Sequence, residues 1–176
     1  MEERGLFVDF MYAVTVGATL PRIDEKVLDF RSPLLWGMLF LIAVFLEDFF
    51  LYHVTVVPNL KGAPRWSGFI LAMLVILTWY VSQAAFPTNP RLFLFAFAFF
   101  FFLKALGGFL MRLTKYPATS DFIFLFPVLA AMILALESDD WPLACHPGRL
   151  LVVLAPIWLA TVVFWWQLNP HPEKSQ

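Results

Sequence analysis

Six apolar segments follow one another along this chain, and they limit its possible folds more than any other feature. A helix needs about 20 mostly apolar residues to cross the hydrocarbon core of a bilayer, with a range of about 17 to 25. The six segments all lie within that range, at residues of about 4–20, 33–57, 66–86, 92–111, 120–136 and 150–168. We therefore predict an all-α integral membrane protein with six transmembrane helices.

The composition supports the same class. Of the 176 residues, 61% are apolar and only 14% are charged, so a soluble domain could not cover its surface with polar groups. The net charge is -1 and no basic stripe is present, which gives no sign of a nucleic-acid partner. The partner expected instead is the lipid bilayer. A single cysteine, Cys145, excludes an internal disulfide and a multi-cysteine metal site.

Local signals mark where several of the segments begin and end. Ser32 followed by Pro33 is typical of a helix cap and a first-turn proline. Pro87 ends the third segment, and Asp121 is placed to favour the amino terminus of the fifth. The connecting segments are too short for a soluble domain, so residues 1–168 are predicted to form one membrane domain.

The remaining sequence gives no sign of an enzyme. Residues 169–176 form a polar, proline-rich tail that we expect to be disordered. The chain has no nucleophile elbow, H-E-x-x-H helix or glycine-rich phosphate loop. We therefore expect no catalytic residue and no cofactor.

An even number of spans puts both termini on the same side of the membrane. A slight excess of basic residues on that side favours the cytoplasm.

Asp9 is the first candidate functional residue, because it lies well inside the first apolar segment. An ionisable group at membrane depth is costly and usually faces a protein interior or an aqueous path. A carboxylate near the start of a helix at the interface is the simpler interpretation. Arg4 is five positions from Asp9, so the two do not share a helix face and each is expected to pair with another helix.

A second group of ionisable residues lies in the second and fourth segments. Glu47, Asp48 and His53 share the second, and Lys104 is in the middle of the fourth. Adjacent helical residues point about 100° apart, so we expect Glu47 and Asp48 not to share one partner, and Lys104 to neutralise one of them. One interpretation is a structural ion pair between the two helices. The other is a proton relay in a carrier. One histidine at depth does not suggest a metal site.

Two other stretches carry structural predictions. The fourth segment is apolar on all faces before Lys104, which suits a lipid-facing helix, and Gly107–Gly108 could allow close helix contact. The string from Thr15 to Thr19, TVGAT, looks like the carbonyl filter of potassium channels. Only fourteen residues precede it, too few for a span and a pore helix, so we predict an ordinary helix there.

The first segment resembles the transmembrane protein 175 family, the endosomal and lysosomal potassium channels and their bacterial relatives. The first helix of that family opens with Arg-x-x-x-Phe-Ser-Asp, followed by small and branched residues. Here Arg4, Phe7, Val8 and Asp9 are matched to the motif residues, with two residues rather than three between Arg4 and Phe7. The second segment, ending FFLYHVTVV, is similar to the aromatic, histidine-bearing second helix of the family. Six spans in fewer than two hundred residues also match the bacterial members, which implies a bacterial inner (plasma) membrane.

This resemblance implies a homotetramer whose central pore is lined by four copies of the first helix. It also implies that monovalent cations pass an apolar ring rather than a carbonyl filter. Val14 would form the constriction, with Gly17 and Ala18 a turn beyond. The residues that would fix the first helix against its neighbours are Arg4, Phe7, Asp9 and His53.

Two departures from the family pattern bear on this expectation. Val8 replaces the motif serine and removes a hydroxyl, and Gly17 implies a wider pore with less potassium selectivity. The expected function is therefore a cation channel permeable to potassium. Two alternatives stay open, a non-catalytic membrane subunit and a proton-coupled carrier. The carrier would use the buried residues Glu47, Asp48, His53 and Lys104.

Overall fold

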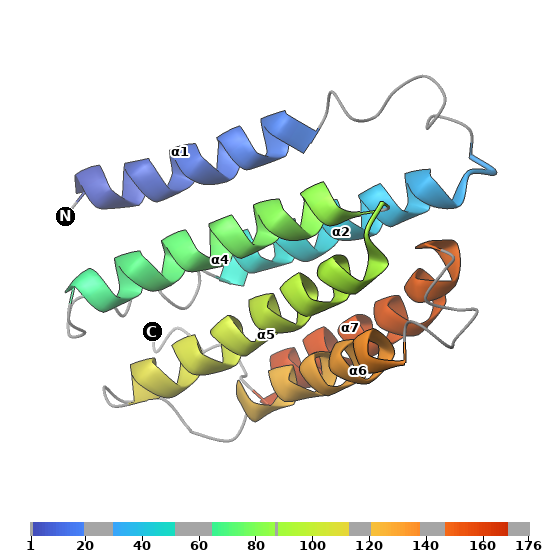
Figure 1. Cartoon of the computed structure of the whole chain (residues 1–176). Helices are drawn as coiled ribbons and strands as arrows, with labels where there is room; N and C mark the ends of the chain where they lie inside the picture. Colours follow the sequence, from blue (N-terminus) through green and yellow to red (C-terminus); the bar gives the residue numbers. More distant parts are fainter. Residues whose placement is uncertain are drawn as a thin grey trace.

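The protein is a bundle of helices that lie side by side (Figure 1). The computed structural model describes residues 2–19, 30–51, 65–86, 88–112, 121–137 and 147–168. Within these ranges the chain forms six α-helices, one short 3-10 helix and no strand, which confirms the all-α prediction. The α-helices are α1 (Glu2–Thr19), α2 (Pro33–Leu51), α4 (Arg65–Ala85), α5 (Pro90–Arg112), α6 (Leu125–Leu136) and α7 (Pro147–Leu168), and the 3-10 helix is η3 (Asp121–Phe124).

Three of the described helices are long and apolar enough to cross a membrane, at Pro33–Leu51, Pro90–Phe109 and Leu150–Leu168. The other three contain shorter apolar stretches of 10–17 residues, at Phe7–Ala18, Phe69–Ala85 and Phe122–Leu136. All six predicted segments are therefore helical where described, and three of them meet the length and composition of a span. Spanning by α1, α4 and α6 stays a prediction.

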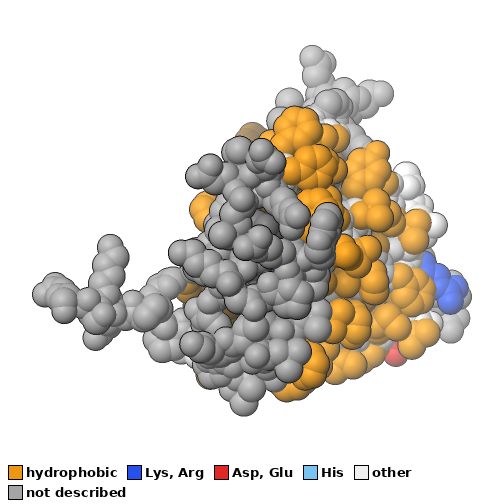
Figure 2. Space-filling model, turned by 90° about the vertical axis from the view of Figure 1, so that its left-hand side faces the viewer, with side chains coloured by type: hydrophobic (Ala, Val, Ile, Leu, Met, Phe, Trp, Pro, Cys, Tyr) orange, Lys and Arg blue, Asp and Glu red, His pale blue; other side chains and the backbone are white. Residues whose placement is uncertain are grey.

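The surface of the bundle is consistent with a membrane protein. Figure 2 shows it from the left-hand side of Figure 1, where the described side chains in view are mostly hydrophobic. Large apolar residues such as Phe10, Trp36, Leu129 and Val152 are more than half exposed. Soluble monomers rarely expose continuous apolar patches of this kind, whereas hydrocarbon accepts them.

The predicted cap at Ser32 is confirmed. Its Oγ accepts the N–H of Leu34 at 3.3 Å, and Pro33 occupies the first helical position of α2. The start of α5 has the same design, because Asn89 Oδ1 accepts the N–H of Leu92 at 3.0 Å after a first-turn proline. The N–H of the first helical residue has no partner within the helix, so a proline at this position loses no hydrogen bond. The capping side chain before it accepts a free N–H of the first turn and so fixes where each helix begins.

The remaining helix limits follow the prediction with local differences. Helix α7 begins at Pro147, earlier than expected, and α4 ends at Ala85, before Pro87. The fifth segment begins as η3 because Pro127 lacks the N–H that would bond back to Ile123 in a continuous α-helix. Residues 52–57 of the second segment and the tail, 169–176, lie outside the described residues.

Helix α5 lies at the centre of the bundle, between α4 and α6 (Figure 1). The expectation of a lipid-facing helix was wrong for most of its surface, since only one side, with Leu92, Phe99 and Phe102, is exposed. Seven of its apolar residues are at most 3% exposed, namely Phe93, Leu94, Phe97, Ala98, Phe100, Phe101 and Leu103. A helix that is apolar on every side suits a protein core as well as it suits lipid. The predicted close contact at Gly107 is present, since a Cβ there would lie 2.8 Å from Leu71 Cδ2 on α4.

Aromatic rings connect the central helices. Tyr12 of α1 packs on Phe45 of α2 at 4.8 Å between ring centroids, and Phe45 stacks on Trp79 of α4 at 4.9 Å. Trp79 then packs on Phe100 of α5 at 5.6 Å. Aromatic pairs at these separations add to the stabilisation from burial. The series fixes α1, α2, α4 and α5 around the polar cluster described below.

Substituting Gly37 by alanine is expected to destabilise the protein. The Phe86 ring occupies the place of the new Cβ, and that ring is itself buried against Phe93, with centroids 5.3 Å apart. Overpacking of this kind costs about 1–3 kcal/mol. Gly17→Ala is the matched control, because a Cβ there has nothing within 4 Å. Thermal unfolding in detergent should therefore show a lower midpoint for Gly37→Ala alone, and equal midpoints for the two variants would contradict the close packing.

Candidate functional site

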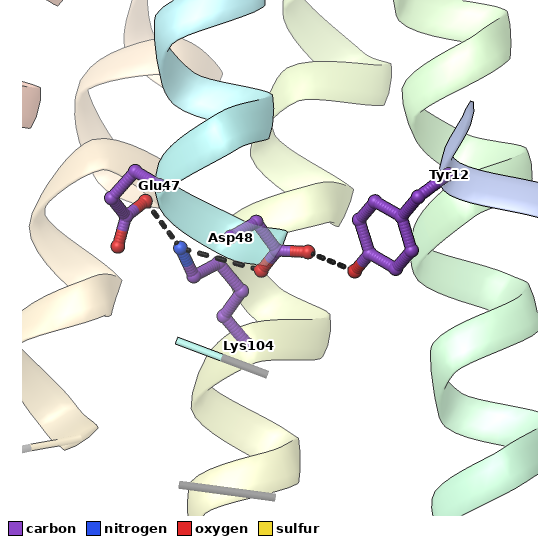
Figure 3. Close-up of polar contacts among 4 residues, drawn as sticks. All are labelled: Tyr12, Glu47, Asp48 and Lys104. Carbon is purple, nitrogen blue, oxygen red and sulfur yellow. Dashed lines mark hydrogen bonds and ion pairs between the residues drawn. The ribbon is translucent and has the colours of Figure 1, made fainter. Parts of the chain in front are cut away.

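A cluster of polar side chains lies inside the bundle, where α1, α2 and α5 meet (Figure 3). The ammonium nitrogen of Lys104, on α5, lies 2.6 Å from Glu47 Oε2 and 3.4 Å from Asp48 Oδ1, both on α2. The phenol of Tyr12, on α1, donates a hydrogen bond of 2.6 Å to Asp48 Oδ2. One continuous network therefore joins three helices. We call these four residues the polar cluster.

The expectation that Glu47 and Asp48 could not share a partner was wrong. Figure 3 shows the Lys104 side chain approaching from α5 between the two carboxylates. The two residues do leave α2 in different directions, but their side chains and the lysine stem are long enough to bring the charged ends together. The prediction of a counter-charge was right, and Lys104 serves both acids.

The polar cluster is shielded by apolar groups. Side-chain exposure is 6% for Lys104, 11% for Glu47 and 9% for Asp48. The ammonium also lies over three aromatic rings, with centroid distances of 5.5, 5.5 and 4.9 Å for Phe100, Phe101 and Phe124, respectively. Charges removed from water need pairing and hydrogen bonds to be tolerated. The ion pairs, the Tyr12 hydroxyl and these rings supply that compensation.

Glu47 is the least satisfied member of the polar cluster. Its Oε1 is buried without a hydrogen-bond partner within the part of the chain that the structure describes, although Oε2 binds Lys104. The Trp158 indole of α7 interacts with this carboxylate, but its buried Nε1 does not reach hydrogen-bonding geometry. Buried polar atoms left without a partner are costly. The Glu47 side of the cluster therefore depends strongly on Lys104.

Helix α1 has two distinct faces. Val8, Tyr12 and Thr15 are buried against the bundle, while Val14 is 45% exposed on the opposite face. The predicted constriction residues Gly17 and Ala18 are exposed as well. All three are therefore exposed at the surface of the bundle. The stretch around Thr15 is α-helical, as predicted, and its hydroxyl donates back to the carbonyl of Met11 at 2.8 Å.

The rest of the proposed α1 network is described only in part. The Phe7 ring lies beside Phe69 of α4, with 6.0 Å between centroids, and Asp9 is partly buried. The side chain of Arg4 and all of His53 lie outside the described residues, so their part in the network stays a prediction. Two residues separate Arg4 from Phe7, one fewer than in the family motif.

Sequence reasoning missed Tyr12. Its hydroxyl was a usable signal, because a phenolic O–H inside an apolar segment normally finds a hydrogen-bond partner when buried. The identity of that partner, Asp48, could not be read from a separation of 36 positions. Within the described helices, no group of three or more histidine, cysteine, aspartate or glutamate side chains is placed to hold a metal ion.

Comparisons with known proteins give no relative for this chain: no family model, curated protein or solved structure matches it. The resemblance of the first segment to the potassium-channel family therefore stays an expectation. Any function has to be inferred from the helices, the polar cluster and the exposed face of α1.

Proposed function

We propose that this chain is the subunit of a cation-permeable channel, assembled as a homo-oligomer with α1 lining the pore. The observation that carries the proposal is the two-sided character of α1. One face is fastened to the bundle through Tyr12, while Val14, Gly17 and Ala18 face outward. Copies arranged about an axis, four in the proposed assembly, would bring this outward face together.

An apolar ring is a workable constriction for monovalent cations. Narrow hydrophobic segments of a pore gate by losing and regaining water, and they need no charge in the wall. Val14 is the largest of the three constriction residues and would set the narrowest point. Gly17, with open space around its Cα, leaves the pore wide one turn further on. Such a pore passes potassium and sodium with little discrimination.

The polar cluster supports this division of roles. Lys104 contacts both acids, so its single positive charge is shared between Glu47 and Asp48 inside the subunit, and the Tyr12 hydroxyl also donates to Asp48. In the proposed channel the polar cluster holds α1 in position against the bundle, and ions do not pass through the cluster. A proton-coupled carrier would instead need these acids to exchange protons during each cycle, and neutralising either acid would then abolish transport.

The decisive experiment measures potassium flux into liposomes that contain the purified protein. We expect rapid flux for the wild type, faster leak for Val14→Ala and blocked flux for Val14→Trp. Val163→Trp on α7 is the matched control, because Val163 is 44% exposed and α7 lies on the opposite side of the bundle from α1 (Figure 1). Equal flux in Val14→Trp and Val163→Trp, or no flux in the wild type, would contradict the proposal.

A further inference from the structure

A groove of about 820 Å³ runs between the first turns of α2 and α7. Its lining is mainly apolar and includes Trp36 on α2 together with Val152, Ala155 and Pro156 on α7. Arg31, just before α2, also lines it. The two helices touch at this end, since a Cβ added to Gly148 would lie 2.6 Å from the Pro33 side chain. The groove is separate from both the polar cluster and the outward face of α1.

The position of the groove matches the outer part of one membrane leaflet. The candidate spans begin at Pro33 in α2 and at Leu150 in α7, so in a bilayer Arg31 would lie where the chain leaves the hydrocarbon. The Trp36 indole donates to the carbonyl of Phe30 at 3.0 Å, a placement typical of the membrane interface. Along α7 the lining extends from Gly148 to Pro156, about 12 Å at the rise of an α-helix.

These dimensions select an acyl chain as the occupant. Half of a hydrocarbon core is about 15 Å deep, so one lipid tail can follow the groove over most of its leaflet. Arg31, an exposed residue, is then level with the lipid headgroups. A cation at this depth attracts an anionic headgroup and fits its phosphate oxygens. An aliphatic groove below a cation is thus complementary to both parts of an acidic phospholipid.

We propose that this groove binds one anionic phospholipid of the surrounding bilayer, with an acyl chain between α2 and α7 and the headgroup on Arg31. Val152 is 73% exposed and lines the groove, so it contacts the chain. This binding does not depend on whether the protein conducts ions. It supplies a preference for acidic lipid at one end of the bundle.

The test uses the full chain in nanodiscs made of equal parts phosphatidylglycerol and phosphatidylethanolamine. After detergent extraction and washing, mass spectrometry counts the lipids that remain bound. The wild type should retain phosphatidylglycerol in preference. Arg31→Gln should reduce that preference about fivefold, the effect of one basic residue near an anionic surface. Val152→Trp should fill the groove and remove most of the retained phospholipid of both kinds.

Two matched controls decide the outcome. Arg91→Gln removes an exposed arginine at the start of α5, at the same end of the bundle as the start of α2 (Figure 1). Val163→Trp adds the same bulk elsewhere on α7. If Arg31→Gln behaves like Arg91→Gln, headgroup recognition by Arg31 is wrong. If Val152→Trp retains as much phospholipid as Val163→Trp, or if the wild type retains the two phospholipids equally, the proposed site is wrong.

Discussion

Replacing Lys104 by methionine should lower the free energy of unfolding by about 3–5 kcal/mol, the cost of removing one partner from a buried ion pair. Methionine keeps an unbranched apolar side chain of similar length and removes the ammonium group. Among the described side chains, Glu47 and Asp48 would then have no counter-charge, and they would repel each other while buried. The loss should be visible as a much lower thermal midpoint in detergent and a lower yield of folded protein.

A triple variant separates charge from packing. Combining Lys104→Met with Glu47→Gln and Asp48→Asn removes all three charges and should recover most of the lost stability, because replacing a whole buried ion pair is often close to neutral. If the triple variant is as unstable as the single one, the contacts of the Lys104 ammonium with the Phe100 and Phe124 rings carry the effect, and the ion pairs do not. A wild-type midpoint for Lys104→Met would contradict the ion pairing itself.

The helices could be predicted from sequence because their limits are set locally. Apolar length defined the segments, and the Ser32–Pro33 pair marked the start of α2, where the structure has it. A residue inside a segment can also move the limit of its α-helix. Pro127 removes one backbone donor, and the fifth segment therefore opens as a 3-10 turn before α6 begins. Local chemistry is readable at this level, since each effect acts within one or two turns.

The place of α5 in the bundle could not be predicted in the same way. Hydrocarbon and a protein core both accept apolar side chains, so hydropathy alone does not distinguish a central helix from a lipid-facing one. The difference lies in ring contacts between helices, such as Phe97 with Phe40 of α2 at 6.0 Å between centroids. Such contacts join residues far apart in the sequence, and no local pattern encodes them.

The polar cluster was predicted in part. Lys104 was expected to neutralise one acid because a buried charge needs a partner, and this general requirement does not depend on geometry. That it serves both Glu47 and Asp48 depends on how α5 crosses α2, which the sequence does not state. The contact of Tyr12 with Asp48 likewise depends on how α1 lies against α2. The residue types indicated that buried polar partners were needed, but which residues pair could be seen only in the fold.

Tyr12→Phe should loosen α1 more than any other single-atom change in that helix. The variant keeps the ring packing on Phe45 and Phe49 and removes only the hydroxyl, so Asp48 Oδ2 loses its donor. A hydrogen bond to a charged group contributes about 1.5–3 kcal/mol. At about 1.4 kcal/mol per factor of ten, this shifts the equilibrium between α1 packed on the bundle and α1 detached from it by about 10- to 150-fold.

The change can be followed by unfolding and by flux in the same preparation. Tyr80→Phe is the control, because Tyr80 is 46% exposed on α4 and loses the same atom. We expect a lower unfolding midpoint for Tyr12→Phe alone, and the midpoint should fall little further when Asp48→Asn is added. If α1 lines the pore, releasing it also widens the ring of Val14 side chains, so the flux of both potassium and sodium rises. A destabilised Tyr12→Phe protein with unchanged flux would keep the hydrogen bond as a structural contact and remove α1 from the conduction path.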